Sequence, residues 1–141
     1  MLAINATEVR REWSAVSETV IREKPAFIKR TRDYMALINL NMLEGVLAPY
    51  NFTADRFVEA DGSITLSLNQ IDLIENGRTE TEAKQSLAQA IIDYAEDYYS
   101  QFSVWSAAPN RKAHIPYILK ALIINDANKI GEQLSCQNGK N

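Results

Sequence analysis

The chain has 141 residues, of which 46% are hydrophobic and 23% are charged, so one globular domain or two small ones are expected. A net charge of −3 argues against a protein coated with basic charge for nucleic acid, and a single cysteine, Cys136, excludes an intramolecular disulfide and a cysteine-based zinc site. With neither a signal-like start nor an apolar run long enough for a membrane span, we expect a soluble cytoplasmic protein without membrane contact.

The charge is unevenly distributed along the chain. Residues 1–50 carry seven Lys/Arg and six Asp/Glu, whereas residues 51–141 carry eight and twelve. The basic residues of the first part cluster at Arg10-Arg11 and at Lys29-Arg30 with Arg32. This split indicates one part that tolerates phosphate and one that repels it. The best candidate linker is residues 48–51, which predicts an α+β chain with domains at 1–50 and 51–141.

The first fifty residues predict a strand at 2–4, one helix from about 6 to 24, a two-stranded hairpin and a short helix at 42–47. Asn5 or Thr7 can cap the long helix, and Pro25 ends it. Apolar runs at 26–28 and 35–38 predict the hairpin strands, with a polar turn at 29–34. The predicted buried face of the helix, in steps of four, three and four, consists of Val9, Trp13, Val16 and Val20.

The rest of the chain predicts a small sheet followed by helices. Strands are expected at 57–59 and 63–68 around an Asp61-Gly62 hairpin turn, and at 71–74, stopped by Asn76-Gly77. Thr79 and Glu82 match a capping box, which predicts a long helix after them. Residues 115–124 favour a buried helix, with a strand as the open alternative; a short helix at 128–134 and a frayed tail at 137–141 follow. The long helix should bury Ala83, Leu87, Ile91, Tyr94, Tyr98 and Phe102.

Four stretches of the N-terminal third resemble the Phd/YefM family of antitoxins: INATEVR at 4–10, the helix to Val20, PAFIKR at 25–30 and ALINL at 36–40. The resemblance implies a unit that forms a homodimer and binds operator DNA upstream of its own genes. It also implies that the first helix and the hairpin turn carry the basic contacts, with Arg10 and Arg30 at the matching positions. The family turn commonly holds glycine, and residues 31–34 contain none, which leaves the reach of Arg32 open.

Six residues are therefore expected to contact DNA. Arginine can fork onto a phosphate or onto a guanine edge, and two copies in a dimer double the phosphate contacts. The alternative is that Arg10 and Arg11 only solvate an exposed helix face and pair with Glu8 or Glu12. The expected DNA-binding set is Asn5, Thr7, Arg10, Arg11, Arg30 and Arg32.

Residues 61–91, DGSITLSLNQIDLIENGRTETEAKQSLAQAI, are similar to the core of HicB antitoxins. In that fold a small β-sheet carries a helix and covers a ribonuclease toxin. The acidic balance of this part suits a basic ribonuclease toxin as partner. Tyr99 and Trp105 are the candidate partner-binding residues, because Tyr99 lies one step off the apolar face of the helix. Core packing is the alternative for these aromatic residues.

The sequence contains no P-loop, dinucleotide-binding or nucleophile-elbow motif, so we expect a type II antitoxin that is not an enzyme and has no cofactor or metal. One rival is a small ribonuclease toxin that uses His114 as a general base, although its sequence neighbours offer no orienting carboxylate. The other is a dimeric scaffold that no longer binds DNA. The acidic residues Asp93, Glu96 and Asp97 favour a solvated helix face over a metal site.

Overall fold

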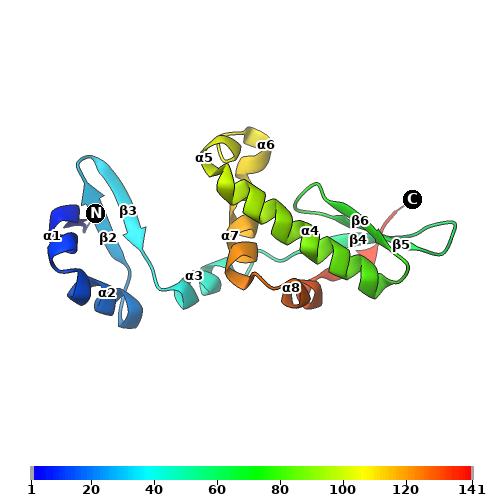
Figure 1. Cartoon of the computed structure of the whole chain (residues 1–141), viewed down its shortest axis with the longest axis horizontal. Helices are drawn as coiled ribbons and strands as arrows, with labels where there is room; N and C mark the ends of the chain where they lie inside the picture. The colour runs from blue at the N-terminus through cyan, green and yellow to red at the C-terminus, as the bar shows by residue number, and fades with distance from the viewer. Residues whose placement is uncertain (1, 141) are drawn as a thin grey trace. The chain divides into compact units, whose positions relative to one another are not determined.

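A computed structural model describes residues 2–140, which form an N-terminal unit up to Val46 and a C-terminal unit from Leu47 (Figure 1). Each unit combines helices with a sheet of its own, which confirms the α+β class. The first sheet has the order β1-β2-β3 and the second β6-β5-β4-β7. Among the described residues, no helix is both long and apolar enough to cross a membrane.

In the N-terminal unit the expected long helical segment forms two helices, of which the first packs on a small three-stranded sheet and the second contacts the first. β1 runs parallel to β2, and β2 pairs with β3 in antiparallel fashion. The elements are β1 (Ile4–Asn5), α1 (Ala6–Arg11), α2 (Trp13–Arg22), β2 (Ala26–Arg30), β3 (Asp33–Leu37) and α3 (Leu40–Leu47).

The prediction of one continuous helix over residues 6–24 is wrong, because the helix breaks at Glu12. Glu12 has φ −106° and ψ 31°, outside helical values, although its N–H still donates to the carbonyl of Glu8 at 2.8 Å. The break divides the predicted apolar face. Val9 and Val20 are buried as expected, whereas the Trp13 side chain remains 54% exposed.

The hairpin turn is tighter than the predicted turn at 29–34. Arg30 pairs with Asp33, so only Thr31 and Arg32 lie between the strands. Thr31 has φ +58°, a left-handed conformation that a β-branched residue rarely adopts and that glycine tolerates. The turn therefore closes without the glycine that is common in Phd/YefM antitoxins, and the left-handed Thr31 strains the backbone.

In the C-terminal unit the long helix α4 lies across one face of the four-stranded sheet, and α7 and α8 pack against α4 (Figure 1). The strand β7 comes from the end of the chain and runs parallel to β4. The elements are β4 (Thr53–Val58), β5 (Ile64–Leu68), β6 (Ile74–Gly77), α4 (Glu80–Ser100), α5 (Phe102–Trp105), α6 (Pro109–Lys112), α7 (Ile115–Ile124), α8 (Ala127–Gln133) and β7 (Ser135–Asn138).

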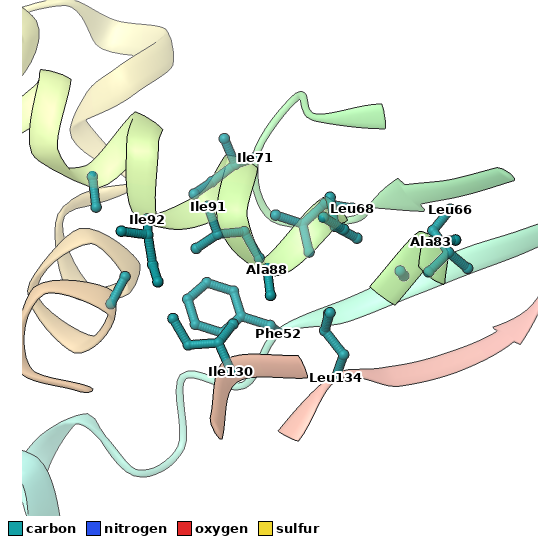
Figure 2. Packing of buried hydrophobic residues seen from close by; sticks show 14 of the residues in the cluster. Phe52, Leu66, Leu68, Ile71, Ala83, Ala88, Ile91, Ile92, Ile130 and Leu134 are labelled. Carbon is teal, nitrogen blue, oxygen red and sulfur yellow. The ribbon is translucent and has the colours of Figure 1, made fainter. Parts of the chain in front are cut away.

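The core of this unit forms between the sheet and its helices. The alternation predicted for β5 is confirmed: Ile64, Leu66 and Leu68 are buried, and Thr65 and Ser67 are more exposed. Figure 2 shows the Phe52 ring close to Ile91 and Ile130. Each fully buried side chain of this size contributes about 1.5–3 kcal/mol, so this cluster dominates the stability of the unit.

The predicted capping box starts α4 with one difference in partner. Thr79 Oγ1 accepts a hydrogen bond from the N–H of Glu82 at 3.2 Å, as expected. The Glu82 carboxylate accepts from the N–H of Arg78 at 3.0 Å, one residue before the expected donor. Ala83, Leu87 and Ile91 on the predicted face are fully buried, as is Tyr98. Tyr94 is only partly buried, and Phe102 lies beyond α4, in α5.

The third strand and the C-terminal tail differ from the prediction. β6 spans Ile74–Gly77 rather than 71–74, and its Asn76 amide donates across the sheet to Ser63 Oγ (3.0 Å) and Thr65 Oγ1 (2.9 Å). Gln137 and Asn138 of the expected frayed tail instead belong to β7, and just beyond this strand the N–H of Gly139 donates to the carbonyl of Arg56 at 2.8 Å. Asn141 lies outside the described residues. Both segments are held by pairing with a neighbouring strand, and their short sequences contain no pattern that predicts this pairing.

The helices after α4 were only partly predicted. Residues 115–124 form the expected helix α7 with Pro116 in its first turn, so the strand alternative is wrong. The predicted helix at 128–134 is α8, which begins one residue earlier and is capped by Asp126. Phe102, which was expected on the long helix, instead begins the short helix α5, and the short helix α6 follows it.

Candidate nucleic-acid interface

Four of the six residues expected to bind DNA line one hollow of about 370 Å³ in the N-terminal unit. Arg10 lies in α1 and Arg30 at the end of β2, so two segments twenty residues apart in sequence contribute guanidinium groups to it. We refer to this feature as the polar hollow. Its lining residues are Asn5, Ala6, Thr7, Arg10, Lys29, Arg30 and Thr31.

Strand pairing explains why these residues meet. Asn5 is the register partner of Lys29 in the parallel β1–β2 pair, so the start of α1 lies beside the end of β2. Asn5 occupies the N-cap position of α1, but its side chain makes no capping hydrogen bond. Its amide therefore remains available to a ligand in the hollow. Lys29 was not among the expected DNA contacts.

The charge of the polar hollow is uncompensated within the described residues. Neither Arg10 nor Arg30 forms an ion pair there, and both side chains are exposed. Arg10 and Arg30 thus line a polar space without a carboxylate partner, and arginine groups of this kind can bind a phosphate. The ammonium group of Lys29 lies 5.8 Å from the centroid of the Tyr34 ring. The alternative that Arg10 pairs with Glu8 or Glu12 does not occur in this structure.

The other two expected contacts lie outside the polar hollow. Arg11 pairs with Glu12 at 3.6 Å, between two exposed side chains. Arg32 is exposed in the hairpin turn, next to Thr31. An exposed pair such as Arg11–Glu12 contributes little to stability, so Arg11 can still exchange its partner for a phosphate. Arg11 and Arg32 thus directly follow lining residues in the sequence, but neither lines the polar hollow itself.

Next to the polar hollow lies a second hollow of about 380 Å³ with apolar walls, which we call the Trp13 groove. Trp13 is 54% exposed and Met35 is 48% exposed, although both are large apolar side chains. Arg10 lines this groove as well as the polar hollow. The residues of the Trp13 groove are Ala6, Val9, Arg10, Trp13, Ile28, Met35 and Leu37.

The two candidate partner-binding residues have different surroundings. Tyr99 is 68% exposed near the end of α4, so its side chain is free to meet another molecule. Trp105 instead belongs to an aromatic cluster: it stacks on Tyr94 with ring centroids 5.6 Å apart, and the guanidinium of Arg111 lies 4.1 Å from its centroid. Trp105 therefore packs within its own unit, as the core alternative predicted.

His114, the candidate catalytic base, belongs to the same aromatic cluster. Its Nδ1 lies 2.9 Å from the hydroxyl of Tyr94. Burial, with a smaller contribution from Arg111, lowers the pKa of His114 below its ordinary value. No described carboxylate orients the ring, and the described residues contain no group of three or more His, Cys, Asp or Glu side chains suited to a metal.

Cys136 lies in β7 and is half-buried. Burial raises the pKa of its thiol above the ordinary range, with smaller effects from Lys84 and Glu80. The protonated thiol is a poor nucleophile, which fits a structural role in the sheet.

Comparison with known proteins gives three similarities. Residues 1–136 match the model of a family described as "Antitoxin of toxin-antitoxin, RelE / RelB, TA system". A crystal structure described as the antitoxin part of a proposed toxin/antitoxin system from Syntrophomonas wolfei subsp. wolfei is 34% identical, with a TM-score of 0.92. That similarity covers 99% of this chain and 100% of the other. Cadherin-23 of Rattus norvegicus is 35% identical over 106 residues, 68% of this chain, but the chain spans only 3% of that protein.

Proposed function

The chain belongs to the antitoxin family of RelE/RelB toxin–antitoxin systems, and from this membership we propose that it represses its own operon and neutralises its toxin by direct binding, as a type II antitoxin. We place the N-terminal unit with the Phd/YefM antitoxins as the DNA-binding and dimerisation domain, and the C-terminal unit, with its HicB-like sheet and helix, as the toxin-interaction domain. In this proposal the protein is not an enzyme and acts in the cytoplasm.

The polar hollow is the observation that supports operator binding most directly. Arg10 and Arg30 line one space together with the polar residues Asn5 and Thr7. A DNA phosphate fits such a space because it accepts several charge-assisted hydrogen bonds at once. The nearby Arg11 and Arg32 are exposed and extend the contact along the duplex.

The exposed apolar surface of the N-terminal unit supports a homodimer. Nine large apolar side chains of this small unit are exposed. So many exposed large apolar side chains on a unit that ends at Val46 indicate a surface that a partner covers. The exposed large apolar residues of the unit are Leu2, Trp13, Ile21, Phe27, Tyr34, Met35, Leu40, Met42 and Val46.

The exposed face of α4 supports toxin binding by the C-terminal unit. Asp93, Glu96 and Asp97 are exposed near Tyr99 in the second half of this helix. A basic ribonuclease toxin complements such a surface, and its RNA site would then be covered sterically and electrostatically. The exposed Tyr99 ring supplies an aromatic contact at this surface.

The operator proposal is tested with Arg10→Ala and Arg30→Ala. Fluorescence anisotropy measures binding to a labelled duplex that covers the DNA upstream of the gene, across a salt series. In a dimer each substitution removes two phosphate contacts, so the slope of log affinity against log salt should fall by about two. Affinity at low salt should fall about tenfold or more.

Arg22→Ala is the matched control, because Arg22 pairs with Glu18 outside the polar hollow and the charge change is identical. Its affinity should stay within about twofold of the wild type. Equal losses for Arg22→Ala and Arg10→Ala would point to a general charge effect and contradict a site at the hollow.

The toxin proposal is tested with the protein encoded by the adjoining reading frame. Calorimetry should give a one-phase titration with the wild type and a weaker one with Tyr99→Ala, because truncating a central aromatic contact costs about 1–2 kcal/mol or more. The control Tyr34→Ala changes an exposed tyrosine of the N-terminal unit and should bind the toxin normally.

A further inference from the structure

Arg10 is the one charged residue shared by the polar hollow and the Trp13 groove. Ala6 is the other common residue, and it has no polar group. The two hollows therefore meet at a single flexible side chain. The Arg10 side chain is long enough for an occupant of the Trp13 groove to pack against its aliphatic stem while its guanidinium group reaches the polar hollow.

Arg10 has no partner to hold it in either hollow. Among the described residues it forms neither an ion pair nor a side-chain hydrogen bond, in contrast to Arg11 and Arg22, which pair with carboxylates. An arginine with a free side chain loses rotamer entropy when it binds a ligand. A neighbour that restricts the stem beforehand reduces this loss and strengthens the contact.

Arg30 provides a natural comparison within the same site. It lines the polar hollow from the end of β2 but is absent from the Trp13 groove. An occupant of the groove can therefore restrict the Arg10 side chain by direct contact. It can affect Arg30 only through the overall geometry of the complex. This difference separates local ordering of a side chain from the general advantage of two linked binding sites.

We infer that a second copy of the chain seats in the Trp13 groove and holds Arg10 over the polar hollow, so that the phosphate contact of Arg10 depends on dimerisation. The inference rests on the proposed operator-binding function. A second copy is the occupant because the described part of this unit buries only four apolar residues within itself and leaves nine large ones exposed, Trp13 and Met35 among them. β3, which carries Met35, is an edge strand and is open to a partner.

A double-mutant cycle tests the coupling. Met35→Ala is combined with Arg10→Ala and, in parallel, with Arg30→Ala, and anisotropy measures binding to the upstream duplex. Arg10→Ala should lower affinity about tenfold in the wild type but less than about threefold beside Met35→Ala. Arg30→Ala should lower affinity by the same factor in both backgrounds. Sedimentation at the same protein concentrations reports the oligomeric state, and circular dichroism reports folding.

Three results would overturn the inference. Equal behaviour of Arg10→Ala and Arg30→Ala in the two backgrounds would show that dimerisation acts only by linking two sites. A dimer that survives both Met35→Ala and the stronger Met35→Lys would place the second copy elsewhere. A wild type that dimerises through Met35 yet does not bind the duplex would refute the operator function and, with it, the coupling, while leaving the dimer contact established.

Discussion

At the scale of single residues, the left-handed Thr31 controls the turn beside the polar hollow. Its φ of +58° strains a β-branched residue by roughly 1–2 kcal/mol. Thr31→Gly should relieve this strain and lose about 0.5–1 kcal/mol through the freer unfolded chain, for a net gain of up to about 1.5 kcal/mol. Urea unfolding measures the gain. Thr81→Gly, in the helix α4, is the control and should lose stability.

His114 makes the stability of the C-terminal unit depend on pH. Its pKa lies below the ordinary value near 6.5, mainly through burial, so the folded protein binds a proton less readily than the unfolded chain. The contribution of His114 is therefore present above pH 6.5 and is lost as the pH falls below it. Thermal melts between pH 7.5 and 5.0 should show a smaller fall for His114→Gln than for the wild type. An identical pH profile would contradict this assignment.

The polar hollow was partly predictable from the sequence. Arg10 and Arg30 followed from the resemblance to a known family, and the structure brings them to one hollow. Lys29 was missed because the turn was expected to start there, whereas β2 continues to Arg30 and keeps Lys29 on the strand beside Asn5. Residue types alone do not show that a strand continues to pair beyond the end of its apolar run.

At the scale of elements, local signals were predictable and long-range ones were not. The capping residues Thr79 and Glu82 and the alternation of β5 both act within a few residues, and both were found in the sequence. β7 has no apolar alternation and exists because β4 offers it an open edge. The helix break at Glu12 has no glycine or proline to mark it.

Gly77 joins β6 to α4 at a close approach that depends on the absence of a side chain. A Cβ at this position would lie 2.4 Å from the backbone nitrogen of Ala83, which cannot move away without shifting the helix. Gly77→Ala should therefore cost roughly 2–4 kcal/mol of unfolding free energy. Gly45→Ala is the control, since a Cβ there meets nothing within 4 Å in α3, and it should gain up to about 1 kcal/mol. Thermal or urea unfolding distinguishes the two.

At the scale of the whole molecule, the two units differ in how many of their side chains are buried. All seventeen residues of the main buried cluster belong to the C-terminal unit, whereas the described buried residues before Val46 are Val9, Val20, Ala26 and Ile28. A core of four small or medium side chains is too small for a stable monomer. This small core supports the proposed homodimer, in which a second copy would supply further burial.

Separate production of the two units tests this difference. Residues 47–141 should melt cooperatively at a temperature that does not depend on concentration. Residues 1–46 should fold only as an oligomer, so their melting temperature should rise with concentration. Circular dichroism at several concentrations measures both. Concentration-independent melting of residues 1–46 would contradict the account of a shared core.

The shielded thiol of Cys136 makes the chain well suited to site-specific labelling. At neutral pH a half-buried thiol with a raised pKa reacts slowly with maleimides, because the thiolate is the reactive form. A cysteine introduced at an exposed position such as Ser14→Cys or Ser86→Cys would react far sooner, without prior removal of Cys136. A dye or spin label could then be attached to either unit of an otherwise unaltered chain.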